Sequence, residues 1–409
     1  VFITGFMGGC YPAFFLSSFQ PAVVLKGMGG KSGDKLLRKV LVTIQFSISI
    51  FMLIGTLVIY SQMQFIRNKD LGFDKEQLML INFRSSEDRE KWGVLRNKLI
   101  QNAQIAGAAS SSSTPGDGYP TNSMPVETEE GAMENRSVFS YRVDYDYFST
   151  LGVEIVEGRN FSLEYATDSS QAVLVNEAMV QRMNWTNPIG KKIRIFRNDT
   201  IPPALVVGVV KDFHQRSLYE PITPLMFRPN HVNSYAIVKI IGDVAATTDF
   251  IEATWESTFP TTAFDFGFID QQFMELYEAD QIRGQLFLGF SGMTILIACL
   301  GLLGLASYTA EQRAKEISIR KVLGANTRGL INLLIKEFVT LIVIAAIPAS
   351  VLGYFSMMGW LESFQFHITP GISIFATVLV GTILITVLTT GYHARKAAIA
   401  NPAHKLRSE

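Results

Sequence analysis

One short motif in the sequence has the composition of a nucleotide site, Gly30-Lys31-Ser32. A phosphate-binding loop cradles phosphates with a glycine-rich turn, and it needs another glycine five residues before the Gly-Lys pair. Leu25 occupies that position, and the residues upstream are apolar like a membrane helix instead of forming a strand. We therefore exclude a phosphate loop and predict a flexible link, in which Asp34 caps the helix that follows.

Carboxylates gather around residue 270, where they could act as acid and base. Two suitably spaced carboxylates can hydrolyse a glycosidic bond. Acids that directly precede an apolar run are more typical of a solvated helix face, and this is the interpretation we favour. The five residues concerned are Asp265, Asp270, Glu275, Glu278 and Asp280.

Motifs for nucleophilic or metal chemistry do not occur in the sequence. The histidines show no metal-ligand spacing, and there is neither a Gly-x-Ser-x-Gly elbow nor a Cys–His arrangement. Cys10 and Cys299 both lie in apolar runs, which excludes a disulfide framework and a cysteine-rich zinc site. The sequence thus predicts no catalytic residue, no metal and no cofactor. The histidines are His214, His231, His367, His393 and His404.

Long uncharged runs set the architecture of the 409 residues, of which 48% are hydrophobic and 18% are charged, with a mean hydropathy of +0.22. A bilayer core of about 30 Å needs about 20 helical residues. Pro348 is expected to kink the third membrane helix. The runs contain no charge, which argues against an ion-coupled secondary transporter. The predicted membrane helices lie near 40–62, 285–308, 338–360 and 371–392.

Charge asymmetry predicts the orientation in the membrane. Segments 26–39, 311–337 and 393–409 hold 15 basic and 5 acidic residues in total, whereas 67–283 holds 21 basic and 30 acidic residues. Short basic loops stay in the cytosol. The three basic segments are therefore predicted inside and 67–283 outside, in agreement with the number of predicted helices between them.

The outer block 67–283 is predicted to fold as an α+β or α/β domain, in one unit or two lobes. Ala106–Pro120 is rich in Ala, Ser, Gly and Pro, and we expect a loop or a flexible strand edge there. Strands are predicted at 138–143, 172–175, 193–196, 205–210 and 235–240, and helices near 87–102, 176–184, 246–258 and 271–283.

Both ends of the chain carry the same pattern of residues. Five residues recur at a single offset of 381 positions, and each copy follows an apolar stretch and opens a basic segment. We infer a tandem duplication, in which 1–18 is the end of a membrane helix from a preceding repeat. The matched residues are Tyr11, Ala13, Pro21, Ala22 and Leu25, which recur as Tyr392, Ala394, Pro402, Ala403 and Leu406.

A specific motif follows the second predicted membrane helix. Residues 311–325 read Glu-Gln-Arg-Ala-Lys-Glu-Ile-Ser-Ile-Arg-Lys-Val-Leu-Gly-Ala. This resembles the R-x-x-E-I-x-I-x-K-x-x-G-A loop of FtsX-like, MacB-type ABC transporter permeases. The outer block is also similar to the MacB-type periplasmic core domain, and the resemblance extends over 20–409, where a duplicated eight-helix form is known. The outer segments that carry it are 147–152, 157–161, 187–190 and 207–213.

The pattern of the inner loop, with apolar residues among charges, predicts a short amphipathic helix. A positive-inside anchor would suffice for the basic residues, but its acids favour docking on a protein. By the resemblance, this helix couples to a cytosolic ABC ATPase. The predicted coupling residues are Glu311, Arg313, Lys315, Glu316, Ile317, Ile319, Arg320, Lys321 and Gly324.

The second membrane helix carries a stripe of small residues at Ala298, Gly301, Gly304 and Ser307. Small residues allow close helix approach, although glycine is simply common in membrane helices. We expect this stripe to pack within the permease or against the other repeat.

The fold class is therefore a polytopic α-helical membrane protein with a large extracytoplasmic α+β domain between the first and second full membrane helices. In chain order, the expected parts are the end of a preceding helix, a cytosolic link with an amphipathic helix, a membrane helix, the periplasmic core domain, a membrane helix, the coupling loop, two membrane helices and a cytosolic tail. Their bounds are 1–18, 19–39, 40–66, 67–283, 284–310, 311–337, 338–361, 371–392 and 393–409.

The resemblance implies a non-catalytic permease subunit in the bacterial inner membrane, with 67–283 in the periplasm. It would transmit the motion of a separate cytosolic ABC ATPase to the periplasmic domain, for export or extrusion of an unidentified substrate. The alternative is a membrane-anchored sensor or scaffold that regulates a periplasmic partner such as a cell-wall hydrolase. The expected partners are the ATPase and membrane lipids; a periplasmic or outer-membrane partner stays open, and no nucleic acid is expected.

Overall fold

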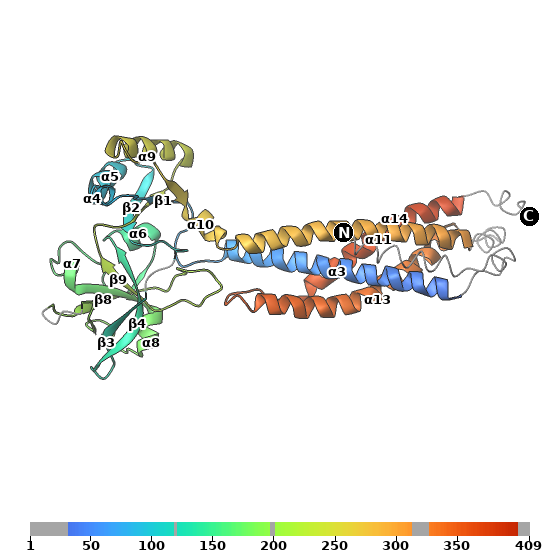
Figure 1. Ribbon diagram of the computed structural model, residues 1–409, viewed down its shortest axis with the longest axis horizontal. Helices are drawn as coiled ribbons and strands as arrows, with labels where there is room; N and C mark the ends of the chain where they lie inside the picture. The colour runs from blue at the N-terminus through green and yellow to red at the C-terminus, as the bar shows by residue number, and fades with distance from the viewer. Residues whose placement is uncertain (1–31, 118–120, 197–200, 313–326, 400–409) are drawn as a thin grey trace, which may run out of the picture. The chain divides into compact units, whose positions relative to one another are not determined.

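The computed structural model describes residues 32–117, 121–196, 201–312 and 327–399, which form two compact units (Figure 1). The outer domain comprises Tyr60–Arg283 and Gly359–Ile368, and the helical unit comprises the other described residues.

The helical unit is built from four helices that are long and apolar enough to cross a membrane. Each has an 18-residue window with a mean hydropathy between 2.2 and 2.4. The fold class expected from the sequence is confirmed, because the α+β domain is inserted between the first and second of these helices. They are α3 (Ser32–Asn68), α11 (Glu278–Gln312), α13 (Thr327–Leu361) and α14 (Ile372–Ile399).

Helix α3 packs closely against its neighbours within the helical unit. The Oγ of Ser47 donates a hydrogen bond to the backbone carbonyl of Ala345 in α13 at 3.0 Å. The hydroxyls of Thr56 and Ser291 in α11 lie 3.0 Å apart. These polar contacts between apolar helices supply interhelical hydrogen bonds where water is absent. Pro348 lies inside α13, which is assigned as a single helix.

The outer domain contains one 11-stranded mixed sheet, ordered β11-β1-β10-β2-β4-β3-β7-β8-β6-β9, with β5 paired to β8. An additional parallel pairing of β4 with β9 closes part of this sheet into a ring. The strands are β1 (Leu78–Asn82), β2 (Ile105–Ser111), β3 (Thr121–Glu127), β4 (Met133–Val143), β5 (Ile155–Gly158), β6 (Ala172–Asn176), β7 (Lys192–Ile193), β8 (Ala204–Val210), β9 (Leu225–Pro229), β10 (Tyr235–Ile240) and β11 (Phe266–Phe268).

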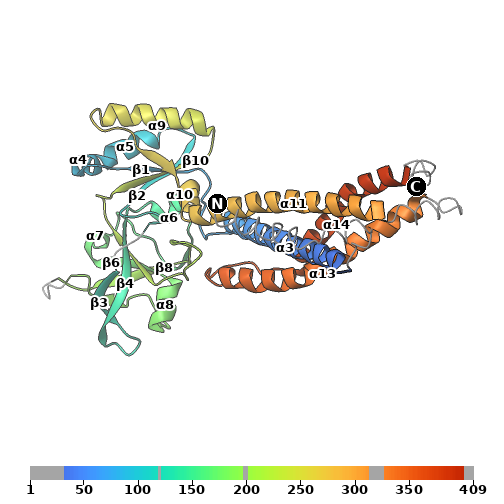
Figure 2. The same ribbon diagram turned by 45° about the vertical axis from the view of Figure 1, so that its right-hand side comes forward.

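Short helices cover the sheet (Figure 2). Helices α5 and α9 pack together on the part of the sheet that lies outside the ring, around buried aromatic side chains that include Trp92 and Trp255. Asp243 caps α9 by accepting from the backbone amides of its first turn, one of them at 2.9 Å. The domain helices are α4 (Ser86–Glu90), α5 (Trp92–Leu99), α6 (Tyr147–Leu151), α7 (Asp168–Gln171), α8 (Glu177–Met183), α9 (Val244–Thr258) and α10 (Ile269–Glu275).

The prediction of a loop or a flexible strand edge at 106–120 is wrong for its first part, which forms strand β2 inside the sheet, between β10 and β4. Its small residues fit a crowded position, because a Cβ on Gly107 would lie 2.9 Å from the hydroxyl of Thr150. The buried hydroxyl of Ser110 accepts a hydrogen bond from Asn233 at 3.0 Å. Small and polar residues here therefore reflect close packing, not flexibility.

Two predicted helices are each divided in the structure. The stretch near 87–102 forms α4 and α5, which meet at Lys91, and the stretch near 271–283 forms α10 and the start of α11. The predicted strand at 193–196 is shorter, because β7 has two residues. The sequence also did not predict β1, β3, β5, β9 and β11.

Candidate functional site

The predicted coupling helix lies almost wholly outside the described residues. Glu311 is in the last turn of α11, which ends at Gln312. Its coupling role therefore stays a prediction. The residues outside the described ranges are Arg313, Lys315, Glu316, Ile317, Ile319, Arg320, Lys321 and Gly324.

The small-residue stripe of α11 lies in the helical unit. Ala298 is buried, and a Cβ on Gly301 would lie 3.1 Å from the amide oxygen of Gln45 in α3. A Cβ on Gly304 would meet no atom within 4 Å. Gly301 thus allows α3 to come near within this chain. A role for the whole stripe, which includes Ser307, stays a prediction.

The acidic run at the start of α11 is divided between surface and interior. Asp270, Glu275 and Glu278 are exposed, as a solvated face requires. Asp280 contradicts that interpretation, because it is only 2% exposed. A buried carboxylate costs free energy unless donors satisfy it, so its partners indicate what this position does.

Asp280 accepts hydrogen bonds from three side chains of the outer domain. The indole nitrogen of Trp360, at the end of α13, donates at 3.3 Å, and Arg283 donates at 2.7 Å. The hydroxyl of Tyr219 also donates to it. Burial and this carboxylate raise the pKa of Tyr219 above its ordinary value. The contact keeps the phenol protonated, so it remains a donor.

The segment between α13 and α14 packs into the same part of the domain. Phe364 is 1% exposed and stacks on Tyr219, with ring centroids 4.1 Å apart. The backbone amide of Phe366 donates to the carbonyl of Leu218 at 3.2 Å. The ring of Phe366 meets His214 edge to face at 4.7 Å. These contacts place the segment in the main hydrophobic core of the domain.

Gln62, near the end of α3, binds this segment through both atoms of its amide. Its nitrogen donates to the carbonyl of Phe366 at 3.1 Å, and its oxygen accepts from the amide of Ile368 at 2.9 Å. The side chain is fully buried. We call the set Gln62, Tyr219, Asp280, Trp360, Phe364 and Phe366 the base junction.

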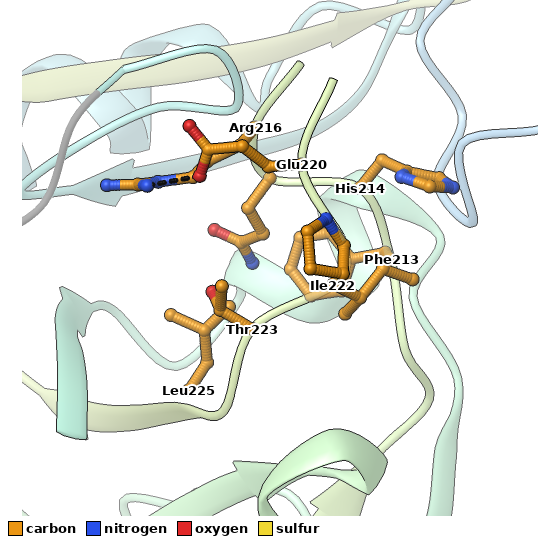
Figure 3. A pocket seen from close by; sticks show the side chains of 9 residues that line it. Phe213, His214, Arg216, Glu220, Ile222, Thr223 and Leu225 are labelled. Atoms are coloured by element: carbon orange, nitrogen blue, oxygen red, sulfur yellow. Dashed lines mark hydrogen bonds and ion pairs between the residues drawn. The ribbon is translucent and has the colours of Figure 1, made fainter. Parts of the chain in front are cut away.

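A small hollow lies beside the base junction, lined by Phe213, Thr223 and Leu225 (Figure 3). Arg216 and Glu220 form an ion pair at its rim. Its volume of about 10 Å³ has room for one water molecule and none for an organic ligand. This hollow is therefore not a substrate site.

His214 packs against the base junction through the ring of Phe366. It is 7% exposed, and its backbone amide donates to the carbonyl of Leu71 at 2.7 Å. Burial, with a smaller contribution from Lys69, lowers the pKa of His214 from 6.5 to about 4. The imidazole is thus neutral at neutral pH and packs as an aromatic ring.

Sequence reasoning did not find the base junction. Two of its residues carried a local signal. Gln62 is an amide inside an otherwise apolar run, and Trp360 is an amphipathic ring at the end of one. A polar residue in such a run requires a partner, and that partner is the segment at 366–368.

Comparison with known families gives two matches that together extend over most of the chain. The model of the MacB-like periplasmic core domain matches residues 41–253, which is more than half of the chain, and the model of the FtsX-like permease C-terminal region matches residues 288–402. The chain belongs to the FtsX-like, MacB-type permeases. The family resemblance expected from the sequence is thereby confirmed.

This permease is similar to two curated relatives and one solved structure. It is 23% identical to the uncharacterized ABC transporter permease YvrN of Bacillus subtilis, over 52% of this chain and 56% of the relative. It is 20% identical to the macrolide export ATP-binding/permease protein MacB of Neisseria gonorrhoeae, over 62% of this chain and 40% of the relative. The chain thus spans about half the length of these relatives. The periplasmic region of MacB from Actinobacillus actinomycetemcomitans aligns with a TM-score of 0.35 at 18% identity, over 50% of this chain and 94% of that structure.

Family membership and the four membrane-length helices establish where the permease resides. It is a multi-pass protein of the inner membrane, with the outer domain as its periplasmic segment. The localisation expected from the family resemblance is confirmed. Each family model matches its own part of the chain, 41–253 or 288–402, and both parts are permease regions.

Proposed function

We propose that this chain is the permease component of an ATP-driven complex, in which motion of a cytosolic ATPase is carried to the periplasmic domain to export an unidentified substrate. Membership of an ABC permease family supports the ATPase partner. The observation that carries the proposal is the base junction. The chain leading from three of the four membrane-length helices enters the same core of the outer domain.

Each of the three chain segments that join these helices to the outer domain contains a residue buried in its core. Ile66, in the last turns of α3, is 1% exposed, and Tyr277, directly before α11, is fully buried. Phe364, which follows α13, is 1% exposed in the same core. Protein interiors are close-packed and transmit strain. A shift of any of these helices would therefore move the core of the domain, which suits mechanical transmission.

Loss of the Phe364 ring tests this coupling. Phe364→Ala removes a buried ring and is expected to destabilise the packing by about 3–5 kcal/mol. The matched control is Phe259→Ala, because Phe259 is 3% exposed in a different core of the same domain. Both variants should lower the thermal midpoint. Only Phe364→Ala should uncouple ATP hydrolysis from substrate movement in the complex copurified with its ATPase.

The inner loop is tested in the same complex. Glu316→Lys combined with Arg320→Glu inverts the charge order of the predicted coupling helix. The control exchanges Glu129 with Lys191, an ion pair of the outer domain with a 3.1 Å separation. We expect the ATPase to be lost or uncoupled only in the first variant. If no ATPase copurifies with the wild type, the sensor or scaffold alternative replaces the permease proposal.

A further inference from the structure

A groove with room for a small molecule lies on the outer domain, away from the base junction residues. It has a volume of about 920 Å³ and is lined by residues of β3 and β4 and by Arg194, Ile195 and Phe196. A second hollow of about 300 Å³ shares Ile195, Phe196 and Arg228 with it. Ligand pockets are commonly about 300–1,000 Å³, so the two hollows together suit an organic ligand.

Two neighbouring arginines line this site: Arg228 lines both the groove and its side hollow, and Arg142 lines the side hollow. Arg142 of β4 and Arg228 of β9 are register partners in the parallel pairing of these strands. Like charges on facing positions repel each other. In the described part of the chain, neither guanidinium forms an ion pair, and the Nε of Arg228 is buried without a hydrogen-bond partner. Burial, and then Arg142, lower the pKa of Arg228.

Arg159, in the same domain, differs from these two arginines because its guanidinium is paired with a carboxylate. Arg159 donates to both carboxylate oxygens of Asp168, at 2.6 and 2.8 Å. Among the described residues that line the groove and its side hollow, there is no Asp or Glu to pair with Arg142 and Arg228. Within this described lining, the two arginines therefore lack a counter-charge.

The lining also contains apolar side chains beside its polar ones. Phe196 is 46% exposed and Met133 is 40% exposed, although both are large apolar side chains. Met124, Pro125 and Ile195 extend this surface. Exposed apolar residues that gather in a concave site with a few polar groups are the usual composition of a ligand pocket.

We propose that this groove binds an amphipathic anion. Its carboxylate or phosphate group sits between Arg142 and Arg228, and its apolar body lies along Phe196 and Met133. Guanidinium groups match the geometry of both anions and bind them in a bidentate way. The proposal does not depend on the ATP-driven role, because binding is measured without an ATPase.

The test uses the full chain in nanodiscs of phosphatidylcholine and titration calorimetry with 1-naphthyl phosphate. Inorganic phosphate and 1-naphthol each carry half of the proposed ligand, and both should bind more weakly. Arg142→Gln and Arg228→Gln should each weaken binding of naphthyl phosphate by at least about tenfold, since a charge-assisted contact is lost. The control is Arg136→Gln, on the same strand but paired with Glu134 outside the groove, and it should leave the affinity unchanged.

Thermal unfolding without ligand separates binding from folding. Relief of repulsion should leave the midpoint of Arg142→Gln equal to or above that of the wild type. Naphthyl phosphate should raise the midpoints of the wild type and of Arg136→Gln more than those of the two groove variants. Competition by dihexanoyl phosphatidic acid would identify a lipid headgroup as the source of the anion; its absence would identify a soluble one.

Three results would overturn the proposal. The first is equal affinity of the two groove variants and the wild type. The second is inorganic phosphate binding as tightly as naphthyl phosphate, which would mean an adventitious ion only. The third is a lower midpoint of ligand-free Arg142→Gln, which would make this arginine structural.

Discussion

Gln62→Leu isolates the connection between α3 and the segment that follows α13. Leucine has nearly the volume of glutamine, so the change removes hydrogen bonds with little change in packing. The amide of Gln62 binds the carbonyl of Phe366 at 3.1 Å and the amide of Ile368 at 2.9 Å. Both backbone groups lose their partner in the variant.

The magnitude follows from those two groups. A buried polar group left without a partner costs about 1–3 kcal/mol, and the added apolar burial of leucine offsets part of the total. We expect local opening of the segment to become easier by about 3 kcal/mol, which corresponds to roughly 100-fold faster exchange. Hydrogen exchange at the amide of Ile368, measured on the full chain in nanodiscs, reports this opening.

Gln64→Leu is the matched control for this experiment. It makes the same substitution two residues further along α3, where the Gln64 side chain donates to Tyr60 of its own helix at 3.2 Å. Exchange at Ile368 should stay at the wild-type rate in this control. Equal exchange in the two variants would refute the argument, because the segment would then be held without Gln62.

Three further predictions concern the outer domain, each checked by thermal or denaturant unfolding of the full chain. Asp168→Asn removes the charged partner of Arg159 from a site that is 1% exposed, and should lower the free energy of unfolding by about 3 kcal/mol. Gly158→Ala places a Cβ 2.4 Å from a backbone carbonyl at a φ of +77°, so it should cost more than Gly131→Ala, where φ is +87° and no atom lies within 4 Å. The folded pKa of His214 is about 4, below its unfolded value, so the contribution of His214 to stability should fall as pH drops from about 6.5 towards 4. His214→Gln should remove this contribution to the pH dependence of stability. If the variant and the wild type have the same pH profile, the prediction is wrong.

The strands that the sequence predicted share one property. Residues 172–175 and 205–210 are runs of valine, leucine and alanine that lie mostly buried in the sheet, as β6 and β8. Such residues fit a pleated, buried surface whichever neighbours they have. The membrane-length helices were predictable for a similar reason, because the length and apolarity of each run are local properties.

Strand β2 shows where local patterns fail. Its sequence, Ile-Ala-Gly-Ala-Ala-Ser-Ser, has low strand propensity and one β-branched residue. The strand forms because β10 pairs with it along nearly its whole length. The glycine at position 107 fits a close contact, since a Cβ there would lie 2.9 Å from the hydroxyl of Thr150. Tertiary contacts decide the conformation here, and no window of the sequence contains them.

The base junction is even harder than β2 to predict from local sequence, because its hydrogen bonds join residues up to 306 positions apart. The membrane runs contain no charged residue, so their composition gave no sign of a polar contact inside them. Gln62 is uncharged, but its buried amide still needs hydrogen-bond partners, although an unpaired amide costs less free energy than an unpaired charge. Asp280 was assigned to a solvated face because its neighbours are acidic, whereas its own side chain is turned to Tyr219 and Trp360.

The arginine pair of the groove also depends on contacts between residues that are far apart in the sequence. Arg142 and Arg228 are unremarkable as single residues, and only the parallel register of β4 and β9 makes them neighbours. Folding brings two like charges together and, within the described residues, supplies no acid between them. A fold that tolerates this repulsion gains nothing from it in stability, so the pair is better explained by what it binds than by what it holds in place.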